Sequence, residues 1–286
     1  MIQAARCDAG VTPCRGTVAA GGVRLSYLEW GSTGAPLLLL HGITSDAQAW
    51  WRIAPVLLEA GYHVFALDMP GHGMSAPTET HTIPDIAALA GAALAALTTE
   101  PAVIIGHSWG GATAIVLASD PPAGIPPLKQ VVLIDPAVRM NPDYGSERLM
   151  LYLDGLGGAV EVLEPVLRER NPDWHACDVY WKARALAACH KQAVRGFFVQ
   201  SGTWDITPLL AKIRVPVLLL VADPRHTVIP PELLFAAQGA ALPLGSQIVT
   251  MFGTDHSIQR GGFKLFMPTV SAWLHTINTL STFQGG

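Results

Sequence analysis

The alternation of short apolar runs with longer helical patterns is the feature that most restricts the fold of this 286-residue chain. Apolar segments of strand length occupy residues 36–40, 63–67, 102–105, 130–134, 215–221 and 247–251, after a hairpin pattern over 16–20 and 23–30. Helical patterns occupy residues 49–60, 84–97, 109–119, 231–240 and 263–280. Strands that alternate with helices pack as a mostly parallel sheet that is covered by helices on both faces. The sequence therefore predicts a doubly wound α/β fold.

Residues 140–205 interrupt this alternation. They contain helical patterns with glycine and proline breaks, no strand-like run, and many aromatic side chains: Tyr144, Tyr152, Trp174, Tyr180, Trp181, Phe197, Phe198 and Trp204. An insertion of this kind between two strands would form a helical cap over the strand ends. We therefore expect a core domain of residues 1–139 and 206–286 and a helical cap of residues 140–205. A small second domain without a role at the site is the alternative.

Composition excludes several classes of partner. Charged residues make up 14% of the chain, the formal net charge is −4, and Lys and Arg do not cluster, so neither nucleic acid nor a membrane surface is an expected partner. No uninterrupted apolar run reaches the roughly 18 residues that a spanning helix needs. The first residues lack the pattern of a secretory signal. These features predict a cytoplasmic monomer or homodimer.

The four cysteines, Cys7, Cys14, Cys177 and Cys189, include no CxxC pair. A chain of this length can build its core without disulfides, so the sequence predicts free thiols in a reducing compartment. A metal site at Cys177, Cys189 and His190 is a much weaker alternative, and no metal site is expected.

The strongest chemical motif is Gly-His-Ser-Trp-Gly-Gly at residues 106–111, between the strand at 102–105 and a helical segment. A serine in this setting, with glycine two residues before and two after, is a nucleophile elbow. The tight turn strains the serine backbone, and the following helix directs its N-terminus at developing negative charge. The motif predicts Ser108 as the nucleophile.

Acyl transfer also needs two hydrogen-bond donors aimed at the oxyanion. One is the amide that follows the nucleophile, which belongs to Trp109. The other is expected from the loop His41-Gly42-Ile43-Thr44 after the strand at 36–40, where Ile43 is the candidate. We expect His41 to shape this loop, with direct proton transfer as the less favoured alternative.

A late histidine supplies the candidate base. His256 lies in Gly-Thr-Asp-His-Ser at residues 253–257, after the last strand and before the last helix. This position matches the chain order serine, acid, histidine. We expect Asp255 to be a loop carboxylate that faces solvent. We expect Asp68, which follows the strand at 63–67, to be a structural turn residue rather than the acid.

Together these segments resemble the α/β-hydrolase superfamily, in particular its capped members, over residues 23–280. The HG loop, a D-x-P-G-x-G-x-S turn at residues 68–75, G-H-S-W-G-G and the late G-x-D-H occur in the family's order. The resemblance implies an eight-stranded sheet, a Ser–acid–His triad and no cofactor.

The position of the acid departs from the family's common pattern. The acid usually follows the seventh strand, but His226 occupies that place and cannot act as an anion. Asp223 lies slightly earlier, and Asp135 ends the preceding strand. Haloalkane dehalogenases and zearalenone-type lactonases are similar in carrying their acid after the sixth strand. Asp135 is therefore preferred and Asp223 is the alternative, although an aspartate can also close a strand without catalysing anything.

These residues predict a serine hydrolase that cleaves a carboxylic ester or lactone through an acyl-enzyme on Ser108. The aromatic cap favours hydrophobic substrates of small to medium size. A carbon–carbon bond hydrolase of dienoic diketones is the second reading and a cofactor-free perhydrolase the third. The alternative from a different functional class is a non-catalytic receptor with the same fold. Ser108 excludes haloalkane dehalogenase and epoxide hydrolase chemistry, which needs a carboxylate there.

Overall fold

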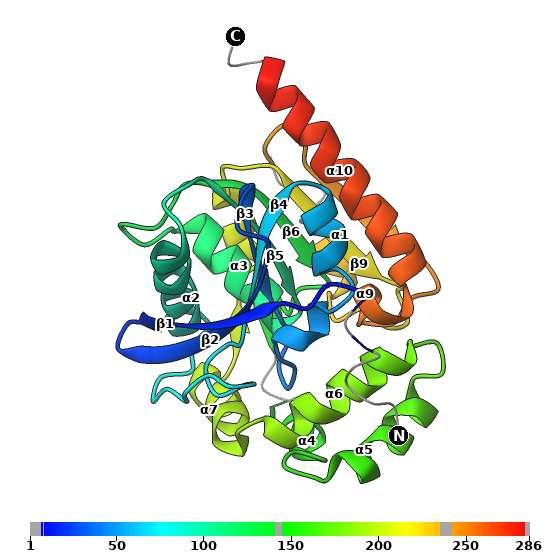
Figure 1. Ribbon diagram of the computed structural model, residues 1–286. Coiled ribbons are helices and arrows are strands. Elements are labelled where there is room, and N and C mark those ends of the chain that lie inside the picture. Colours follow the sequence, from blue (N-terminus) through cyan, green and yellow to red (C-terminus); the bar gives the residue numbers. More distant parts are fainter. Residues whose placement is uncertain (1–6, 8, 141–144, 235–241, 284–286) are drawn as a thin grey trace.

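The computed structural model describes residues 7, 9–140, 145–234 and 242–283, and its centre is an eight-stranded sheet (Figure 1). The strand order is β1-β2-β4-β3-β5-β6-β9-β10. Only the pairs β1–β2 and β2–β4 are antiparallel among these eight strands. The strands are β1 Cys14–Ala20, β2 Val23–Trp30, β3 Ala35–Leu40, β4 Tyr62–Leu67, β5 Ala102–His107, β6 Leu128–Ile134, β9 Val217–Ala222 and β10 Gln247–Met251. The predicted mostly parallel sheet is confirmed.

Both faces of the sheet are covered by helices, as its apolar strands require. Alternate residues of β3 enter two different cores, since side chains alternate across a strand. Leu38 and Leu40 belong to one core, and Leu37 and Leu39 belong to the other. The first core includes α2 (Ile83–Leu97) and α3 (Trp109–Ser119). The second includes α1 (Ala54–Glu59) and α10 (Phe263–Phe283).

Four helices are inserted between β6 and β9, and Figure 1 shows them gathered at one end of the sheet. They are α4 Gly145–Leu153, α5 Val160–Arg170, α6 Ala176–Ala188 and α7 Lys191–Ser201. The sequence predicted no strand here, yet β7 (Arg139–Met140) pairs with β8 (Trp204–Asp205). The division into a core and a cap of residues 140–205 stays a prediction. Tyr144, one of the aromatic residues named for this segment, lies outside the described residues. None of the described helices is long and apolar enough to cross a membrane.

Two predicted helices differ in detail. The pattern over residues 49–60 is a short 3₁₀ helix, η2 (Ala47–Trp50), followed by a turn and α1. Asp46 caps η2 by accepting a hydrogen bond from the amide of Gln48, and Pro55 lies in the first turn of α1, where a missing N–H costs nothing. The pattern over residues 231–240 is helical at 231–234, and the rest lies outside the described residues. Short helices η4 (Thr207–Lys212) and α9 (Ile258–Gly261) were not predicted.

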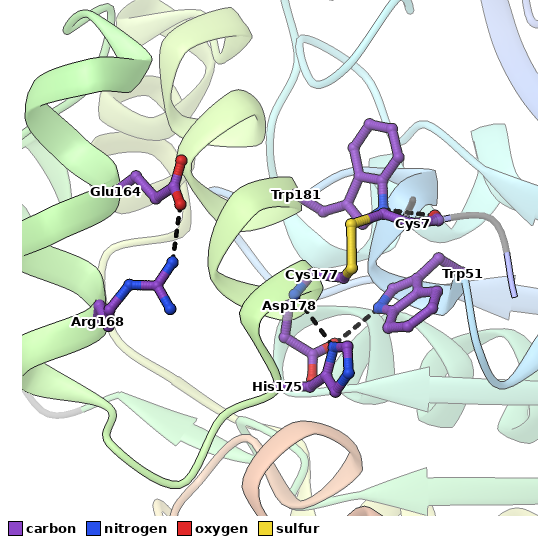
Figure 2. The surroundings of a disulfide bond; sticks show 8 residues. All are labelled: Cys7, Trp51, Glu164, Arg168, His175, Cys177, Asp178 and Trp181. Carbon is purple, nitrogen blue, oxygen red and sulfur yellow. Dashed lines mark hydrogen bonds and ion pairs between the residues drawn. A yellow bond between two sulfur atoms is a disulfide. The ribbon is translucent and has the colours of Figure 1, made fainter. Parts of the chain in front are cut away.

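Cys7 and Cys177 form a disulfide bond (Figure 2), with their Cα atoms 5.4 Å apart and a separation of 170 positions in sequence. The prediction of free thiols is therefore wrong for this pair. Sequence spacing could not reveal the pair, because only folding brings Cys7 against α6. Cys14 is an exposed free thiol and Cys189 a buried one. Disulfides persist in oxidising compartments. The cysteines therefore no longer support the expected cytoplasmic location, which stays a prediction.

Candidate active site

Ser108 lies at the turn between β5 and α3 in a strained backbone conformation, with φ 53° and ψ −115°. Neighbouring main chain holds the turn on both sides. The Ser108 amide donates to the carbonyl of Ile134 at 2.9 Å, and its carbonyl accepts from the amides of Ala112 at 2.9 Å and Ala137 at 3.0 Å. Strain of this kind persists only where the surroundings fix it. The predicted elbow is therefore present at Ser108.

Two glycines of the motif are required by close backbone approach. A Cβ atom at Gly106 would lie 2.3 Å from the carbonyl oxygen of Gly110. A Cβ atom at Gly110 would lie 2.2 Å from the carbonyl oxygen of Leu40. Because the colliding atoms are backbone, neither clash can be relieved by a side-chain rotation. The glycines thus allow α3 to begin directly against β3 and β5.

His256 and Asp135 are in direct contact, with the Nδ1 atom of His256 2.6 Å from Oδ2 of Asp135. Asp135 follows β6 and is fully buried. Three further groups donate to its carboxylate: the amide of Ala222 at 3.1 Å, the amide of Val228 at 3.0 Å and the hydroxyl of Thr227 at 2.5 Å. The carboxylate is thus fixed in place, and it orients the imidazole.

The alternative carboxylate, Asp223, has other partners. Its Oδ1 atom accepts from the amide and Nε of Arg225, and its Oδ2 atom accepts from the amide of Gly253 at 2.9 Å. Hydrogen bonds from Arg225 and Gly253 hold the pKa of Asp223 well below its usual range. His226, at the family's usual acid position, is exposed. The structure therefore brings Asp135, rather than Asp223, to His256.

The loop after β3 lies against Ser108. A Cβ atom at Gly42 would be 3.2 Å from the Cβ atom of Ser108 and 2.8 Å from Nδ1 of His107. The amide of Ile43 donates to no acceptor among the described residues. Trp109 is the first residue of α3, so its amide has no acceptor within the helix. Both predicted oxyanion donors are thus available beside the nucleophile.

Two buried histidines shape this loop in their neutral form. His41 donates from Nδ1 to the carbonyl of Gly42 at 2.8 Å and accepts the amide of Met69 at Nε2, at 3.0 Å. His72 donates from Nδ1 to the carbonyl of Pro70 and accepts the amide of Thr44 at Nε2. Burial lowers the pKa of each histidine to about 3. Because both nitrogens of His41 are occupied, its contacts fit the predicted role in the loop.

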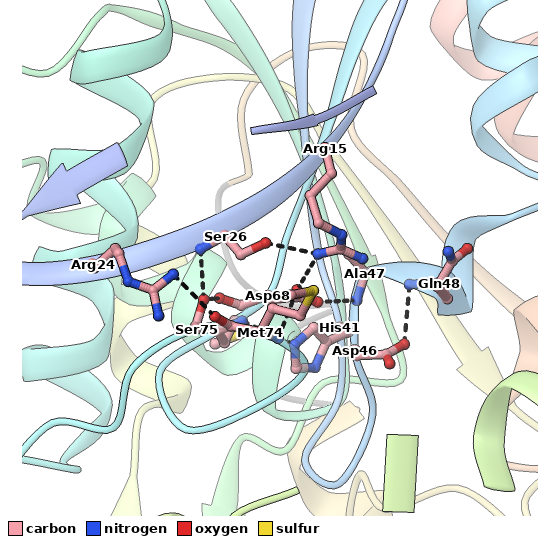
Figure 3. A network of polar contacts seen from close by, with 11 residues as sticks. Arg15, Arg24, Ser26, His41, Asp46, Ala47, Gln48, Asp68, Met74 and Ser75 are labelled. Atoms are coloured by element: carbon pink, nitrogen blue, oxygen red, sulfur yellow. Dashed lines mark hydrogen bonds and ion pairs between the residues drawn. The ribbon is translucent and has the colours of Figure 1, made fainter. Parts of the chain in front are cut away.

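Asp68 is the centre of a structural network (Figure 3). Its Oδ1 atom accepts from the amide of Ala47 at 2.8 Å. Its Oδ2 atom accepts from Nη1 of Arg15 at 2.8 Å and from the amide of Met74 at 3.0 Å. These bonds join the turn after β4 to the loop after β3. The predicted structural role of Asp68 agrees with this arrangement.

Sequence reasoning missed two cations that contact the same loop. Nζ of Lys182 in α6 donates to both the carbonyl and the hydroxyl of Thr44 at 2.7 Å. Nη2 of Arg260 in α9 donates to Oγ of Ser45 at 2.9 Å. Lys182 belongs to no motif, so no sequence signal pointed to it. Arg260 follows His256 by four residues, and this closeness in sequence to the candidate base was the only signal for it.

Asp255 differs from the sequence prediction. Its Oδ2 atom accepts from Nε1 of Trp174 at 2.8 Å, and its Oδ1 atom is buried without a hydrogen-bond partner among the described residues. The expectation of a solvent-facing carboxylate is therefore wrong, because the inserted helices bring Trp174 over it. The guanidinium of Arg260 lies 4.7 Å from the centre of the same indole ring.

Apart from Trp174, the aromatic contacts of the insertion include two separate groups. Phe197 lies 5.5 Å from Trp109 and 5.1 Å from Trp204, measured between ring centroids. Trp181 instead packs on Tyr180 and donates from Nε1 to the carbonyl of Cys7 at 3.1 Å (Figure 2). Only the first group adjoins the predicted oxyanion residue.

Comparison with known proteins defines the class. A sequence-family model described as the alpha/beta hydrolase fold matches residues 35–156. N-formylmaleamate deformylase of Pseudomonas putida is 33% identical over 225 residues, which span 76% of this chain and 81% of that protein. The chain belongs to the α/β-hydrolase superfamily, as its sequence motifs predicted.

Two solved structures illustrate the likeness of fold. E-2-(acetamidomethylene)succinate hydrolase aligns with a TM-score of 0.78 and 20% identity, covering 92% of this chain and 99% of that one. The enol-lactonase from Burkholderia xenovorans LB400 aligns with a TM-score of 0.73 and 20% identity, covering 91% and 100%. At this level of identity the likeness concerns the fold alone.

Proposed function

We propose that this protein is a serine hydrolase that cleaves carboxylic ester or lactone bonds through an acyl-enzyme on Ser108. The observation that carries the proposal is the 2.6 Å contact between Nδ1 of His256 and the buried carboxylate of Asp135. A carboxylate on Nδ1 selects the tautomer in which Nε2 is free to accept a proton. His256 then acts as general base and Asp135 as the acid of the triad.

The first half-reaction forms the acyl-enzyme. Nε2 of His256 accepts the hydroxyl proton of Ser108 while Oγ attacks the carbonyl carbon of the substrate. The carbonyl electron pair moves to oxygen, where the amides of Ile43 and Trp109 stabilise the negative charge. The tetrahedral intermediate then expels the alkoxide, which takes the proton from Nε2. Asp135 stabilises the imidazolium while it exists.

The second half-reaction releases the acid. His256 takes a proton from water, and the oxygen of that water attacks the acyl carbon. The same two amides stabilise the second oxyanion. When the intermediate collapses, Oγ of Ser108 leaves and recovers the proton from His256. Water has then been added across the original ester bond, and the residues of the site are regenerated.

An N-acyl bond is the second candidate, favoured by the 33% identity to N-formylmaleamate deformylase. The same steps apply to a formamide, except that the leaving nitrogen must receive the proton from His256. An amine leaves less readily than an alkoxide, so proton donation by the imidazolium matters more for this substrate.

The test combines turnover with covalent labelling. Wild-type protein should hydrolyse p-nitrophenyl acetate or butyrate with many turnovers per molecule, and a fluorophosphonate should modify Ser108 and stop the reaction. Ser108→Ala should lose at least about 10³ in kcat, because members of a triad act as a unit. Ser119→Ala, at the other end of α3, is the matched control and should keep full activity.

Two results would reject this proposal. Release of a single equivalent without turnover would indicate a binding protein of the same fold. Labelling at another residue, with Ser108→Ala still active, would reject the nucleophile. A parallel assay with N-formyl compounds decides between the ester and N-acyl readings.

A further inference from the structure

Two cationic side chains, those of Lys182 and Arg260, contact the loop after β3 near the inserted helices. Lys182 of α6 holds Thr44 through two hydrogen bonds of 2.7 Å, and Arg260 of α9 holds Ser45 through one of 2.9 Å. Thr44 and Ser45 directly follow Ile43, whose amide is the proposed oxyanion donor. Both charges therefore lie beside the part of the loop that would contact the reacting group.

Neither cation has a carboxylate partner within 4.0 Å in the part of the chain that the structure describes. Arg260 is only 5% exposed, and its Nε atom has no acceptor among these residues. A buried charge without a counter-ion is strongly unfavourable. The site therefore has the electrostatic character of a receptor for an anion.

The acidic side chains nearby offset this charge only in part, because burial lowers the pKa of Arg260 by more than the charges of Asp178, Asp46 and Asp255 raise it. Asp178 accepts from Nη2 of Arg52 at 2.5 Å and from Nε1 of Trp51 at 2.9 Å, so it is already paired. Asp255 accepts a hydrogen bond only from the uncharged indole of Trp174, and its carboxylate offsets part of the charge of Arg260. Burial, together with the charge of Asp68, raises the pKa of Asp46 to about 7. Near neutral pH Asp46 is therefore only partly ionised.

There is also space for a ligand beside Arg260. Arg260 borders a cavity of about 510 Å³, which Arg52, Trp174 and the carboxylates Asp173 and Asp255 also line, whereas Lys182 does not line it. Lys182 keeps part of its surface exposed. Burial, and next the charge of Arg260, lower the pKa of Lys182 to about 7. An incoming anion would raise that pKa again, so binding would restore the full charge of the lysine.

We propose that the substrate is an acid, in which a carboxylate close to the scissile acyl bond is bound by Lys182 and Arg260. This inference rests on the proposed function of the site and adds a substrate class to it. The proximity follows from the sequence of the loop, since the two cations hold the residues next to Ile43. Charge-assisted hydrogen bonds are the strong ones in such recognition.

The experiment compares pairs of esters that differ only in a charge. The first pair is p-nitrophenyl hydrogen glutarate and its methyl ester, with the carboxylate on the acyl side. The second is 4-acetoxybenzoate and its methyl ester, with the carboxylate on the leaving group. Wild-type kcat/KM should favour the anionic member of at least one pair by about tenfold or more.

Variants assign that preference to the two cations. Lys182→Met and Arg260→Met should bring the ratio of kcat/KM to near one, whereas Lys182→Arg should retain much of it. Lys182→Gln repeats the test if the methionine variant does not fold. Arg184→Met is the matched control, because Arg184 is an exposed cation on the same helix and should leave the ratio unchanged.

A binding measurement separates this proposal from the proposed function. Calorimetry of glutarate with Ser108→Ala, alone and combined with Lys182→Met, needs no turnover. Binding that the second substitution weakens by about tenfold supports the anion site even if no ester is cleaved. The proposal is overturned if neither ester pair shows a charge preference and glutarate does not bind. It is also overturned if Lys182→Met lowers both members of each pair equally, since the lysine would then only support the loop.

Discussion

Ser108 and Asp135 occupy equivalent places on neighbouring strands, because β5 and β6 end at residues that pair with each other, His107 and Ile134. Both residues have positive φ, 53° for Ser108 and 40° for Asp135. Such backbone conformations cost about 1–3 kcal/mol each and cluster at functional sites. The amide of Asp135 donates to the carbonyl of Leu220 at 2.8 Å, which helps to fix its turn. The two turns thus place the proposed nucleophile and acid at one edge of the sheet.

Asp135→Asn should reduce kcat on a p-nitrophenyl ester by about 10⁴, because an amide at Nδ1 favours the wrong tautomer of His256. The amide would also oppose one of the backbone N–H groups that now donate to the carboxylate. Asp223→Asn is the comparison and should retain substantial activity, since Asp223 binds Arg225 and Gly253 instead. If the two variants ranked in the opposite order, the acid would be Asp223.

Because the pKa of His72 is lowered in the folded protein, the free energy of unfolding should decrease as the pH falls. Its pKa is about 3 in the folded protein against a usual 6.5, so the folded state binds fewer protons than the unfolded state between these values. Stability is therefore complete above about pH 6.5 and decreases as the pH falls toward 3. In urea unfolding between pH 4 and 6, His72→Gln should flatten the slope by about 1 kcal/mol per pH unit. His275→Gln, which removes an exposed histidine, should leave the slope unchanged, and a similar effect of both variants would contradict the assignment.

The aromatic side chains of the insertion should have separable effects on specificity and stability. Trp204→Ala and Phe197→Leu should change the preference among acyl chain lengths, because Phe197 links Trp204 to Trp109. Trp174→Ala should shift the same preference through its contacts with Asp255 and Arg260. Relative kcat/KM over a series of p-nitrophenyl esters is the measurement. An unchanged profile in all three variants would mean that these rings do not line the pocket.

Trp181→Ala is expected to act differently from those three variants. Its indole packs on Tyr180 and donates to the carbonyl of Cys7, on the side of the disulfide. Loss of this contact should lower Tm and leave the chain-length profile unchanged. A changed profile without a change in Tm would show that Trp181 faces the substrate.

The Cys7–Cys177 bond should stabilise the fold, since it closes a long loop in the unfolded chain. Cys7→Ser should lower the free energy of unfolding by about 2–4 kcal/mol, and a reducing agent should have the same effect on wild type. Cys14→Ser removes an exposed free thiol and serves as the control. Equal stability of wild type and Cys7→Ser under oxidising conditions would contradict this expectation.

The sheet could be predicted well because its signal is local. Each leucine of β3 faces one of two cores, so the whole strand is a short apolar run. The helices on either side of it in the sequence show the different spacing of apolar residues that is typical of helices. The elbow could be predicted equally well, because its glycines are required by the structure. A Cβ atom at Gly106 or Gly110 would lie within 2.3 Å of a backbone oxygen atom.

The remaining features depend on contacts between distant parts of the chain. Lys182 reaches Thr44 across 138 positions, and Trp174 reaches Asp255 across 81. No periodicity or motif encodes such a contact. The choice between Asp135 and Asp223 had the same difficulty, since both end buried strands and only the path of the loop to His256 distinguishes them.

The disulfide of Figure 2 also makes residues 7–177 a closed covalent ring, which contains β1 to β7 and the first two inserted helices, α4 and α5. A protease that cuts once anywhere inside this ring leaves the two fragments attached to each other. The nicked protein would then run as a species of full mass on a denaturing gel and separate into two bands only after reduction. A cut between residue 178 and the C-terminus releases its fragment at once, so the gel alone would tell on which side of Cys177 the chain had been opened.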